Sequence, residues 1–508
     1  MPSKIFSAAT IGLSGALVEV EVDVLGKGLH TFTLVGLPDT SVKESRDRVS
    51  SAIKNSRFKP PYQCGRITVN LAPANLPKAS PIYDLPIAIG FLVATNQIEF
   101  KTKNKMFVGE LALDGRVRPI RGALPIALFA KKLGMEELYL PAENIDEVSV
   151  VENIKIIPVK TLESLVKHLD NQEIIEPAPK ISAEKLCQYA KTELDMKYVK
   201  GHEHAKRALE IAAAGGHNVL FHGPPGSGKT LLAKTFISIL PRLNLEESLE
   251  VTKIYSVSGM LDDTQKLITI RPFRSPHHSA SAVSLIGGGT NPSPGEISLA
   301  HRGVLFLDEF AEFPRLVLEN LRQPLEDGLV TIARAQGTLT FPAHFIMVAA
   351  MNPCPCGFAT DPDKECTCSP VQRIRYTQKI SGPILDRIDM HVEVSRINID
   401  KLESNELGEK SVDIRTRVEK ARDIQKDRLK DVSEITNAEL SSKQVREFCE
   451  LDDESKGLLR SATERLNLSA RAYHRIIKLA RTIADLDGSE KILKNHIAEG
   501  IQYRAKGE

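Results

Sequence analysis

The sequence predicts an α/β protein of several domains, in which a parallel-sheet core stands between an α/β segment and a helical segment. Three observations predict this class. Residues 218–236 read as an apolar strand, a glycine-rich loop and the start of a helix, in that order. Residues 303–309 form a second apolar run, which ends in two adjacent carboxylates. Residues 398–508 carry apolar side chains at helical spacing, and we expect that region to be helical.

The segment before the core alternates strand-like and helix-like runs. Residues 15–24 alternate apolar and polar side chains with a period of two, as a half-buried strand does. Residues 82–96 read as an apolar helix, and residues 107–120 as a hairpin. A polar, proline-rich stretch then reads as a linker. We therefore expect an α/β domain at 1–170, a linker at 171–190, the core at 191–397 and a helical domain at 398–508.

The glycine-rich loop has the order that a phosphate-binding loop requires. Its glycines let the backbone wrap an anion, so that N–H groups and the helix N-terminus face a phosphate chain. Lys229 adds a positive charge for the β- and γ-phosphates, and the Thr230 hydroxyl is a ligand for Mg²⁺. We expect ATP and Mg²⁺ as cofactors, with the nucleotide bound by Gly223, Pro224, Pro225, Gly226, Ser227, Gly228, Lys229, Thr230 and Asp308.

The two carboxylates at the end of the second strand complete a hydrolysis site. Asp308 is expected to hold Mg²⁺, usually through water, and Glu309 to orient and deprotonate the attacking water. A strand that ends in two acids is common by itself. After a phosphate-binding loop, it indicates ATP hydrolysis.

Composition gives few further hints about partners. The 508 residues include 67 Lys and Arg against 65 Asp and Glu, so the net charge is only +2 and any nucleic-acid site must come from local patches. The N-terminus lacks the apolar core of a signal peptide, and no stretch reaches the roughly 18 apolar residues that span a bilayer. We therefore expect a cytoplasmic protein that has no membrane partner.

The N-terminal segment resembles the proteolytic domain of Lon proteases, of the ribosomal S5 domain 2-like fold, in the residues between Gly109 and Gly122. That family uses a Ser–Lys dyad. In this chain the lysine position falls at Leu124, and Ser80 lies near the serine loop but out of register. Without an activated nucleophile no acyl-enzyme can form. The resemblance thus implies a Lon-like domain that is inactive as a protease.

A long segment between the two core strands, residues 264–295, contains no acidic residue. Acid-free basic loops suit contact with nucleic-acid phosphates. The same segment could instead pack on a neighbouring subunit, and both roles can hold together. The candidates for DNA contact in it are Arg271, Arg274, His277 and His278.

Residues 330–341 read as a hairpin. In helicase-like AAA+ ATPases, which the chain resembles in its loop and acidic strand, a hairpin at this point lines the central pore. The resemblance makes Arg334, near the hairpin tip, a candidate for DNA contact, while a purely structural hairpin stays open. It also implies that Asn352, at the end of the apolar run 346–352, hydrogen-bonds the attacking water or the γ-phosphate as sensor 1.

Two arginines occupy positions that matter in AAA+ proteins. Arg387 fits an arginine finger that reaches the ATP of the next subunit, although an ion pair with Asp386 or Asp389 is the alternative. Arg471 stands where the family carries sensor 2, an arginine aimed at the γ-phosphate. The resemblance therefore assigns catalytic roles to Lys229, Asp308, Glu309, Asn352, Arg387 and Arg471.

Four of the seven cysteines cluster directly after Asn352. They form two Cys-x-Cys pairs, nine residues apart, which suits a tetrahedral zinc site better than a disulfide framework. Free thiols or a weak metal-binding loop are the alternatives. The candidate zinc ligands are Cys354, Cys356, Cys366 and Cys368.

The order of these motifs resembles the ComM/YifB family, often described as magnesium chelatase-like, over nearly the whole chain. That resemblance implies a homohexameric bacterial AAA+ ATPase. It implies a motor that acts on single-stranded or branched DNA, by helicase action or branch migration, and promotes integration of transforming DNA by homologous recombination.

Two other classes stay open. A metal-insertion motor would resemble the ATPase subunit of magnesium chelatase, which needs partner subunits and lacks a Lon-like domain. An active Lon-type protease is disfavoured by Leu124. Stimulation of ATP hydrolysis by DNA, by a chelatase partner, or cleavage of casein would separate the three.

Overall fold

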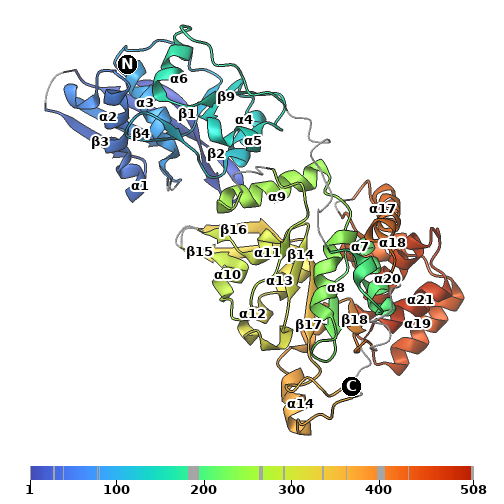
Figure 1. Cartoon of the computed structure of the whole chain (residues 1–508). Coiled ribbons are helices and arrows are strands. Elements are labelled where there is room, and N and C mark those ends of the chain that lie inside the picture. Colours follow the sequence, from blue (N-terminus) through green and yellow to red (C-terminus); the bar gives the residue numbers. More distant parts are fainter. Residues whose placement is uncertain are drawn as a thin grey trace. The chain divides into compact units, whose positions relative to one another are not determined.

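A computed structural model describes the chain as two compact units (Figure 1). The first unit contains Met1–Leu186, Leu245–Ile268 and Gly289–Ser293, and the second contains Cys187–Asn244, Thr269–Gly288 and Pro294–Glu508. Residues 181–190 of the predicted linker lie outside the described residues. The structure describes residues 2–26, 29–37, 39–76, 78, 80–180, 194–261, 267–289, 292–334, 337–361, 363–397, 407–432 and 434–504.

The first unit is built on a mixed seven-stranded sheet of order β3-β4-β2-β1-β5-β8-β9. The β1–β2 and β2–β4 pairs are antiparallel, and the other pairs are parallel. The predicted period of two is present in β2, where Val18, Val20 and Val22 are fully buried. The strands are β1 Ser3–Ile11, β2 Ser14–Val24, β3 Thr31–Val35, β4 Arg66–Ala72, β5 Lys105–Phe107, β8 Glu137–Pro141 and β9 Lys155–Val159, beside the small hairpin β6 Glu110–Leu111 and β7 Val117–Arg118.

Helices pack on this sheet, and one of them comes from the middle of the sequence. α3 and α4 pack on β1 and β2, and α9 packs beside α4. The N–H of Gly122 donates to the backbone oxygen of Ser256 at 3.2 Å, and the Ser256 hydroxyl donates to the buried Glu147. The predicted domain boundaries did not anticipate α9 in this unit. The helices are α1 Thr40–Lys43, α2 Ser45–Asn55, α3 Asp84–Ala94, α4 Ala123–Lys132, α5 Ile145–Val148, α6 Leu162–Leu169 and α9 Leu245–Ser258.

The second unit is built on a parallel five-stranded sheet of order β11-β14-β17-β10-β18. Its strands are short and apolar, as expected for a sheet that is covered on both faces. All the residues of β14 and β17 are buried. The strands are β10 Val219–His222, β11 Phe273–Arg274, β14 Val304–Leu307, β17 Ile346–Met351 and β18 Met390–Glu393.

The expected hairpin also belongs to this unit. It consists of β15, Leu329–Arg334, and β16, Gly337–Pro342, which pair in antiparallel register. Residues 315–327 form two short helices rather than one, because Pro324 has no N–H to continue a single helix and is tolerated only in a first turn. The shorter helices are α10 Ala282–Ile286, α11 Glu296–Leu299, α12 Arg315–Glu319, α13 Arg322–Asp327, α14 Pro370–Thr377 and α15 Gly382–Leu385.

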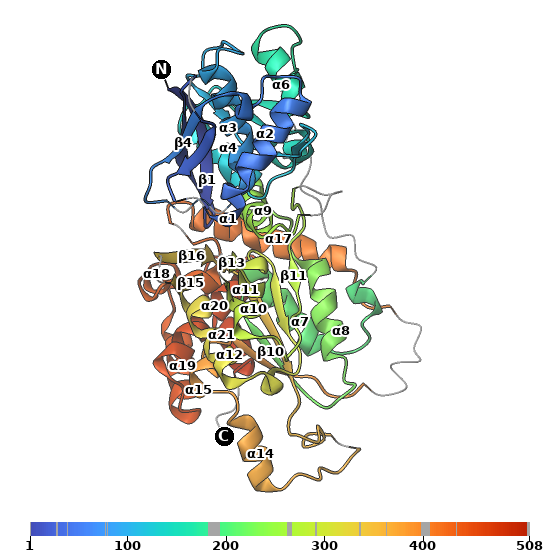
Figure 2. The same ribbon diagram turned by 90° about the vertical axis from the view of Figure 1, so that its left-hand side faces the viewer.

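The C-terminal part is helical in its described residues, as the sequence predicts. Helices α18 to α21 lie together in both views (Figures 1 and 2). α17 and α20 also pack against α7, which precedes β10, the strand that leads into the phosphate-binding loop. The helices are α7 Glu203–Gly215, α8 Lys229–Thr235, α17 Ser411–Arg428, α18 Ser442–Phe448, α19 Asp453–Arg465, α20 Ala470–Leu486 and α21 Lys494–Gln502.

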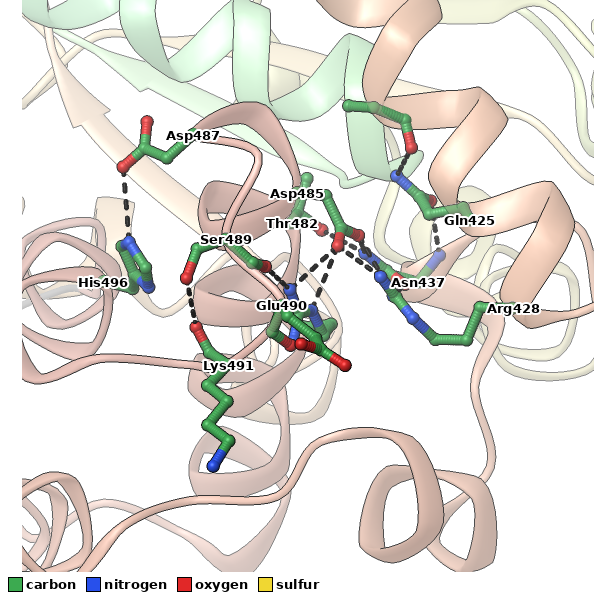
Figure 3. Close-up of polar contacts among 12 residues, drawn as sticks. Gln425, Arg428, Asn437, Thr482, Asp485, Asp487, Ser489, Glu490, Lys491 and His496 are labelled. Carbon is green, nitrogen blue, oxygen red and sulfur yellow. Dashed lines mark hydrogen bonds and ion pairs between the residues drawn. The ribbon is translucent and has the colours of Figure 1, made fainter.

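A buried polar network ties these helices to each other and to α7 (Figure 3). The fully buried carboxylate of Asp485 accepts hydrogen bonds from Arg428, Arg481 and Asn437. Gln425 donates to the backbone oxygen at position 214, at the end of α7, at 3.1 Å. Because a buried carboxylate is stable only when it is paired, this network fixes the position of α20. No helix among the described residues is long and apolar enough to cross a membrane.

Candidate nucleotide site

The predicted phosphate-binding loop joins β10 to α8 at the carboxyl end of the parallel sheet. Gly228 is the N-cap of α8 and has a φ of +89°, which is the left-handed region that favours glycine. A Cβ at Gly223 would lie 2.1 Å from the backbone oxygen of Val394, so only glycine fits where the loop leaves the sheet. The loop thus presents its backbone and the start of α8 where open α/β sheets bind their ligands.

Lys229 links this loop to the end of the neighbouring strand. Its Nζ donates to the backbone oxygens of Gly223 at 2.7 Å and Pro224 at 2.8 Å, and it lies 3.3 Å from Oδ1 of Asn352. Burial lowers the pKa of Lys229, against the opposing charge of Asp308. Since β17 lies beside β10, Asn352 follows directly on the strand next to the loop. The structure therefore brings the predicted lysine and the predicted sensor together.

The two acids lie at the end of β14, on the other side of β17. The Thr230 hydroxyl donates to Oδ2 of Asp308 at 2.9 Å, and the N–H of Glu309 donates to Oδ1 of Asp308 at 3.0 Å. A hydroxyl and a carboxylate at this separation can hold one Mg²⁺ ion between them. Glu309 has a φ of +52° and a half-exposed carboxylate whose Oε2 lies 2.9 Å from Nδ1 of His278.

The two predicted arginines form a second group. Arg387 donates to the carboxylate of Glu326, and Arg471 donates to the other oxygen of that carboxylate at 2.8 Å. Arg387 also donates to the backbone oxygen of Pro383 at 2.7 Å and is only 5% exposed. The ion-pair partner of Arg387 is thus Glu326, rather than Asp386 or Asp389. Among the described residues, the polar contacts of both side chains go to this group and not to the phosphate-binding loop.

Models of magnesium chelatase subunit ChlI match this chain at residues 195–402 and 19–144, and a model of the ChlI C-terminal region matches residues 408–504. Competence protein ComM of Haemophilus influenzae is 46% identical over 506 residues, which cover 99% of this chain and 97% of that protein. The chain belongs to the ComM/YifB family. YifB of Escherichia coli is 43% identical over 509 residues, again with 99% and 97% coverage.

Membership of the ComM/YifB family confirms the predicted resemblance. Together with the site geometry, it makes this chain an AAA+ ATPase of the magnesium chelatase type. A weaker match, 28% identical over 173 residues, covers 31% of this chain and 30% of Lon protease 2 from Bacillus subtilis. The Lon-like similarity is therefore partial.

The positions expected for the protease dyad are described only in part. Leu124 is fully buried on α4, and its N–H donates to Oε1 of Glu147 at 2.9 Å. Ser80 precedes a short 3-10 turn, Pro81–Tyr83, and its side chain makes no N-cap hydrogen bond. The chain thus has an apolar side chain where the Lon family places its lysine, and the absence of protease activity stays a prediction.

Two arginines of the basic segment make contacts with other parts of the second unit. The Arg271 guanidinium donates to the backbone oxygens of Pro241 at 2.7 Å and Arg302 at 2.6 Å. Arg274 makes a bidentate pair with Glu296 at 2.6 and 2.7 Å. Of the four candidates for DNA contact in this segment, these two therefore have a structural task as well.

The remaining candidates lie at the end of that segment and on the hairpin. The ring of His277 lies 4.1 Å from that of His278 and its Nδ1 lies 2.8 Å from the hydroxyl of Ser279. Arg334 is the last residue of β15 and pairs with Gly337, next to the turn. The hairpin was predicted at 330–341 and is observed within one residue of those bounds.

The sequence did not predict the surroundings of two histidines near the nucleotide site. His278 was predicted to contact DNA, but its contact with Glu309 was not foreseen. His202 is the N-cap residue of α7. Its Nε2 is buried with no hydrogen-bond partner among the described residues, 3.4 Å from where a Cβ of Gly228 would lie. Its left-handed φ of +57° at the start of α7 is the kind of signal that marks a functional position.

The four predicted metal ligands converge. Their Sγ atoms all lie within 4.8 Å of one another, and three pairs are 3.3, 3.5 and 3.6 Å apart. A tetrahedron with zinc–sulfur bonds of about 2.3 Å has sulfurs about 3.8 Å apart, so the thiols are grouped at nearly the size that a zinc ion needs. Donation from the N–H of Phe358 lowers the pKa of Cys356 to about 5, which supplies a thiolate ligand. The site abuts the phosphate-binding loop, because a Cβ at Gly357 would lie 2.6 Å from Pro225.

Proposed function

We propose that this protein is an ATP-driven motor that acts on DNA as a homohexamer. Its work is strand displacement or branch migration, by which it promotes integration of transforming DNA by homologous recombination. One observation carries the proposal: Lys229 lies beside Asn352 and Thr230 beside Asp308 in a chain that is 46% identical, over 99% of its length, to a competence protein. The proposed setting is the cytoplasm, where ATP and the chromosome are available.

In the proposed reaction, the loop and Lys229 bind the β- and γ-phosphates of ATP. Thr230 and Asp308 would hold Mg²⁺, which neutralises charge on the phosphates when it is bound. Glu309 takes a proton from the water that attacks the γ-phosphorus. Asn352 orients that water or the γ-phosphate, since its amide already lies beside the amine of Lys229.

The arginine pair supports the proposed ring. Arg387 and Arg471 both bind Glu326, whose carboxylate carries the same sign of charge as a γ-phosphate. We infer that the γ-phosphate of the next subunit takes the place of Glu326, so that each ATP is completed by two arginines of a neighbour. Bidentate guanidinium contacts suit a phosphoryl group in the transition state. Hydrolysis is then efficient only in the assembled ring.

The DNA path is assigned to two elements. The hairpin β15–β16 carries Arg334 beside its turn, at the point where helicase-like AAA+ proteins present a pore hairpin. The basic segment carries His277 and His278, while Arg271 and Arg274 hold the segment in place. Contacts of this kind go to phosphates, so binding is expected to weaken with salt and to depend little on sequence.

We further propose that the cysteine cluster binds zinc. Four thiols within one small sphere fit a tetrahedral ion, and zinc is the common metal for such a set. When bound, zinc supplies a rigid cross-link between the two Cys-x-Cys pairs. That cross-link would fix the loop that contacts Pro225 and so support the shape of the phosphate-binding loop.

The alternative function is that of the ATPase subunit of a metal-insertion complex, which the matches to magnesium chelatase subunit ChlI favour. The deciding experiment is ATP-dependent branch migration on a labelled four-way or three-stranded DNA. We expect product with the natural chain and none with Glu309→Gln. Absence of product, with hydrolysis stimulated by chelatase partner subunits and not by DNA, would reject the motor and select the alternative.

A further inference from the structure

Helix α14, Pro370–Thr377, is exposed on nearly all sides. Tyr376 is its only buried residue, and both views show α14 standing away from the sheet of the second unit (Figures 1 and 2). So short a helix is marginal in water without packing. Its start is instead held by a capping box, in which Ser369 accepts from the N–H of Gln372 and the Gln372 side chain accepts from the N–H of Ser369. The chain thus maintains a helix that adds little to the core.

The exposed face of α14 joins apolar and cationic side chains. Val371 and Ile374 are 56% and 55% exposed. Arg375 follows Val371 by four residues, so it shares their face of the helix. The side chains of Arg373 and Arg375 have no ion pair or hydrogen bond within the part of the chain that the structure describes. No acidic residue occurs between positions 366 and 385, so nothing nearby in the sequence offsets their charge.

The other side of the helix is anchored beside the nucleotide site. Burial raises the pKa of Tyr376 to about 12, against a hydrogen bond from the backbone of Asn352, the predicted sensor. Lys379, just beyond the helix, pairs at 2.8 Å with Glu312, in the short turn soon after β14. At the other end, the cysteine cluster finishes at Cys368, two residues before the helix. A movement of the sensor or of that turn during hydrolysis is therefore passed on to α14.

The ligand that fits this face is DNA at a point where two strands part. Proteins that distort DNA insert apolar side chains between base steps, and basic side chains bind the flanking phosphates. The unpaired arginines of α14 complement phosphates in charge. We propose that α14 is a wedge for branched DNA. Val371 and Ile374 enter between bases where the strands part, and the two arginines bind the phosphates beside them. The inference rests on the proposed function and adds the element that separates the strands.

The test compares two double variants of the full chain with Mg²⁺ and ATP. Val371→Ser with Ile374→Ser should slow branch migration of a labelled four-way DNA junction by about ten-fold, because unstacking of each step loses the support of the wedge. ATP hydrolysis with single-stranded DNA should stay as in the natural chain, since a single strand has no base pairs to separate. Arg373→Ala with Arg375→Ala should weaken junction binding and reduce the slope of log affinity against log salt by about two, one for each lost phosphate contact.

Two controls remove the same chemistry elsewhere in the second unit. Val412→Ser removes a 53% exposed valine from α17. Lys456→Ala with Arg460→Ala removes two exposed positive charges from α19. Neither should change branch migration or the salt slope. Branch migration at the natural rate by the Val371→Ser, Ile374→Ser variant would overturn the wedge. Loss of the assembly that the natural chain forms with ATP, seen by size-exclusion chromatography, would also overturn it and make this face a contact between subunits.

Failure of the proposed function has a different signature. A natural chain that moves no junction with ATP would overturn the motor itself. The salt dependence of junction binding by the natural chain and by the Arg373→Ala, Arg375→Ala variant would then still decide whether α14 contacts DNA. Equal slopes for the two proteins would overturn that contact.

Discussion

Asp485→Ala should destabilise the C-terminal helices more than any exposed substitution near it. The carboxylate is fully buried and accepts hydrogen bonds from Asn437 at 2.8 Å, from Arg481 at 3.1 Å and from Arg428 at 3.1 Å (Figure 3). Burial lowers the pKa of Arg481, against the opposing charge of Asp485. Removing the acid leaves two buried or half-buried guanidinium groups uncompensated, which costs about 3–5 kcal/mol.

The assay is thermal unfolding followed by far-ultraviolet circular dichroism, because the region is helical and the chain has no tryptophan. At about 2–4 °C per kcal/mol, the midpoint should fall by roughly 6–20 °C. Asp487→Ala is the control. It lies on the same stretch, is 46% exposed, and its contacts are with His496 at 3.3 Å and Arg207 at 3.8 Å. If the two variants unfold at the same temperature, the reasoning about the buried network is refuted.

Three further predictions concern the nucleotide site, the metal and pH. Lys229→Ala should abolish nucleotide binding or turnover, whereas Glu309→Gln should bind ATP and lose roughly 10²–10⁴-fold in kcat, as measured by ATP binding and phosphate release. The chain as purified should contain one zinc per protomer by elemental analysis, and Cys356→Ser should contain far less. Burial alone would raise the pKa of Glu439, but the hydrogen bond with His344 lowers it to about 2. The contribution of Glu439 to stability, roughly 3 kcal/mol, is thus complete above about pH 4.5 and lost as the pH falls toward 2. Glu439→Gln should lower the unfolding midpoint at pH 7 and converge with the natural chain at low pH.

The features that are predicted best are those carried by one continuous stretch of the sequence. The phosphate-binding loop, the strand before Asp308 and the hairpin at 329–342 are each marked by one short run of residues, and the structure has them where expected. The approach of Asn352 to Lys229 also follows, since adjacent parallel strands end at the same edge. The four cysteines meet because both pairs stand at the ends of one short loop.

The features that could not be predicted depend on tertiary packing. Nothing local in residues 245–258 shows that α9 packs against α4 rather than against the sheet beside it in sequence. The contact between His278 and Glu309 requires the strand order, which places β11 beside β14. Glu326 lies in a short polar helix that gives no hint that two distant arginines share it.

Helix α20 connects the buried network around Asp485 with residues close to the phosphate-binding loop. α20 carries Arg471 at its start, and one turn later Arg475 donates to the buried Asp389 and to the backbone oxygen of Arg387. Asp389 directly precedes β18, which pairs with the P-loop strand β10, and it accepts from the N–H of Asn218 just before that strand. Since the other end of α20 is anchored by Asp485, a loss there reaches the arginines as well as the fold. Asp485→Ala should therefore lower the rate of ATP hydrolysis even at temperatures where the protein stays folded, and a variant with a normal rate would show that α20 does not position Arg471.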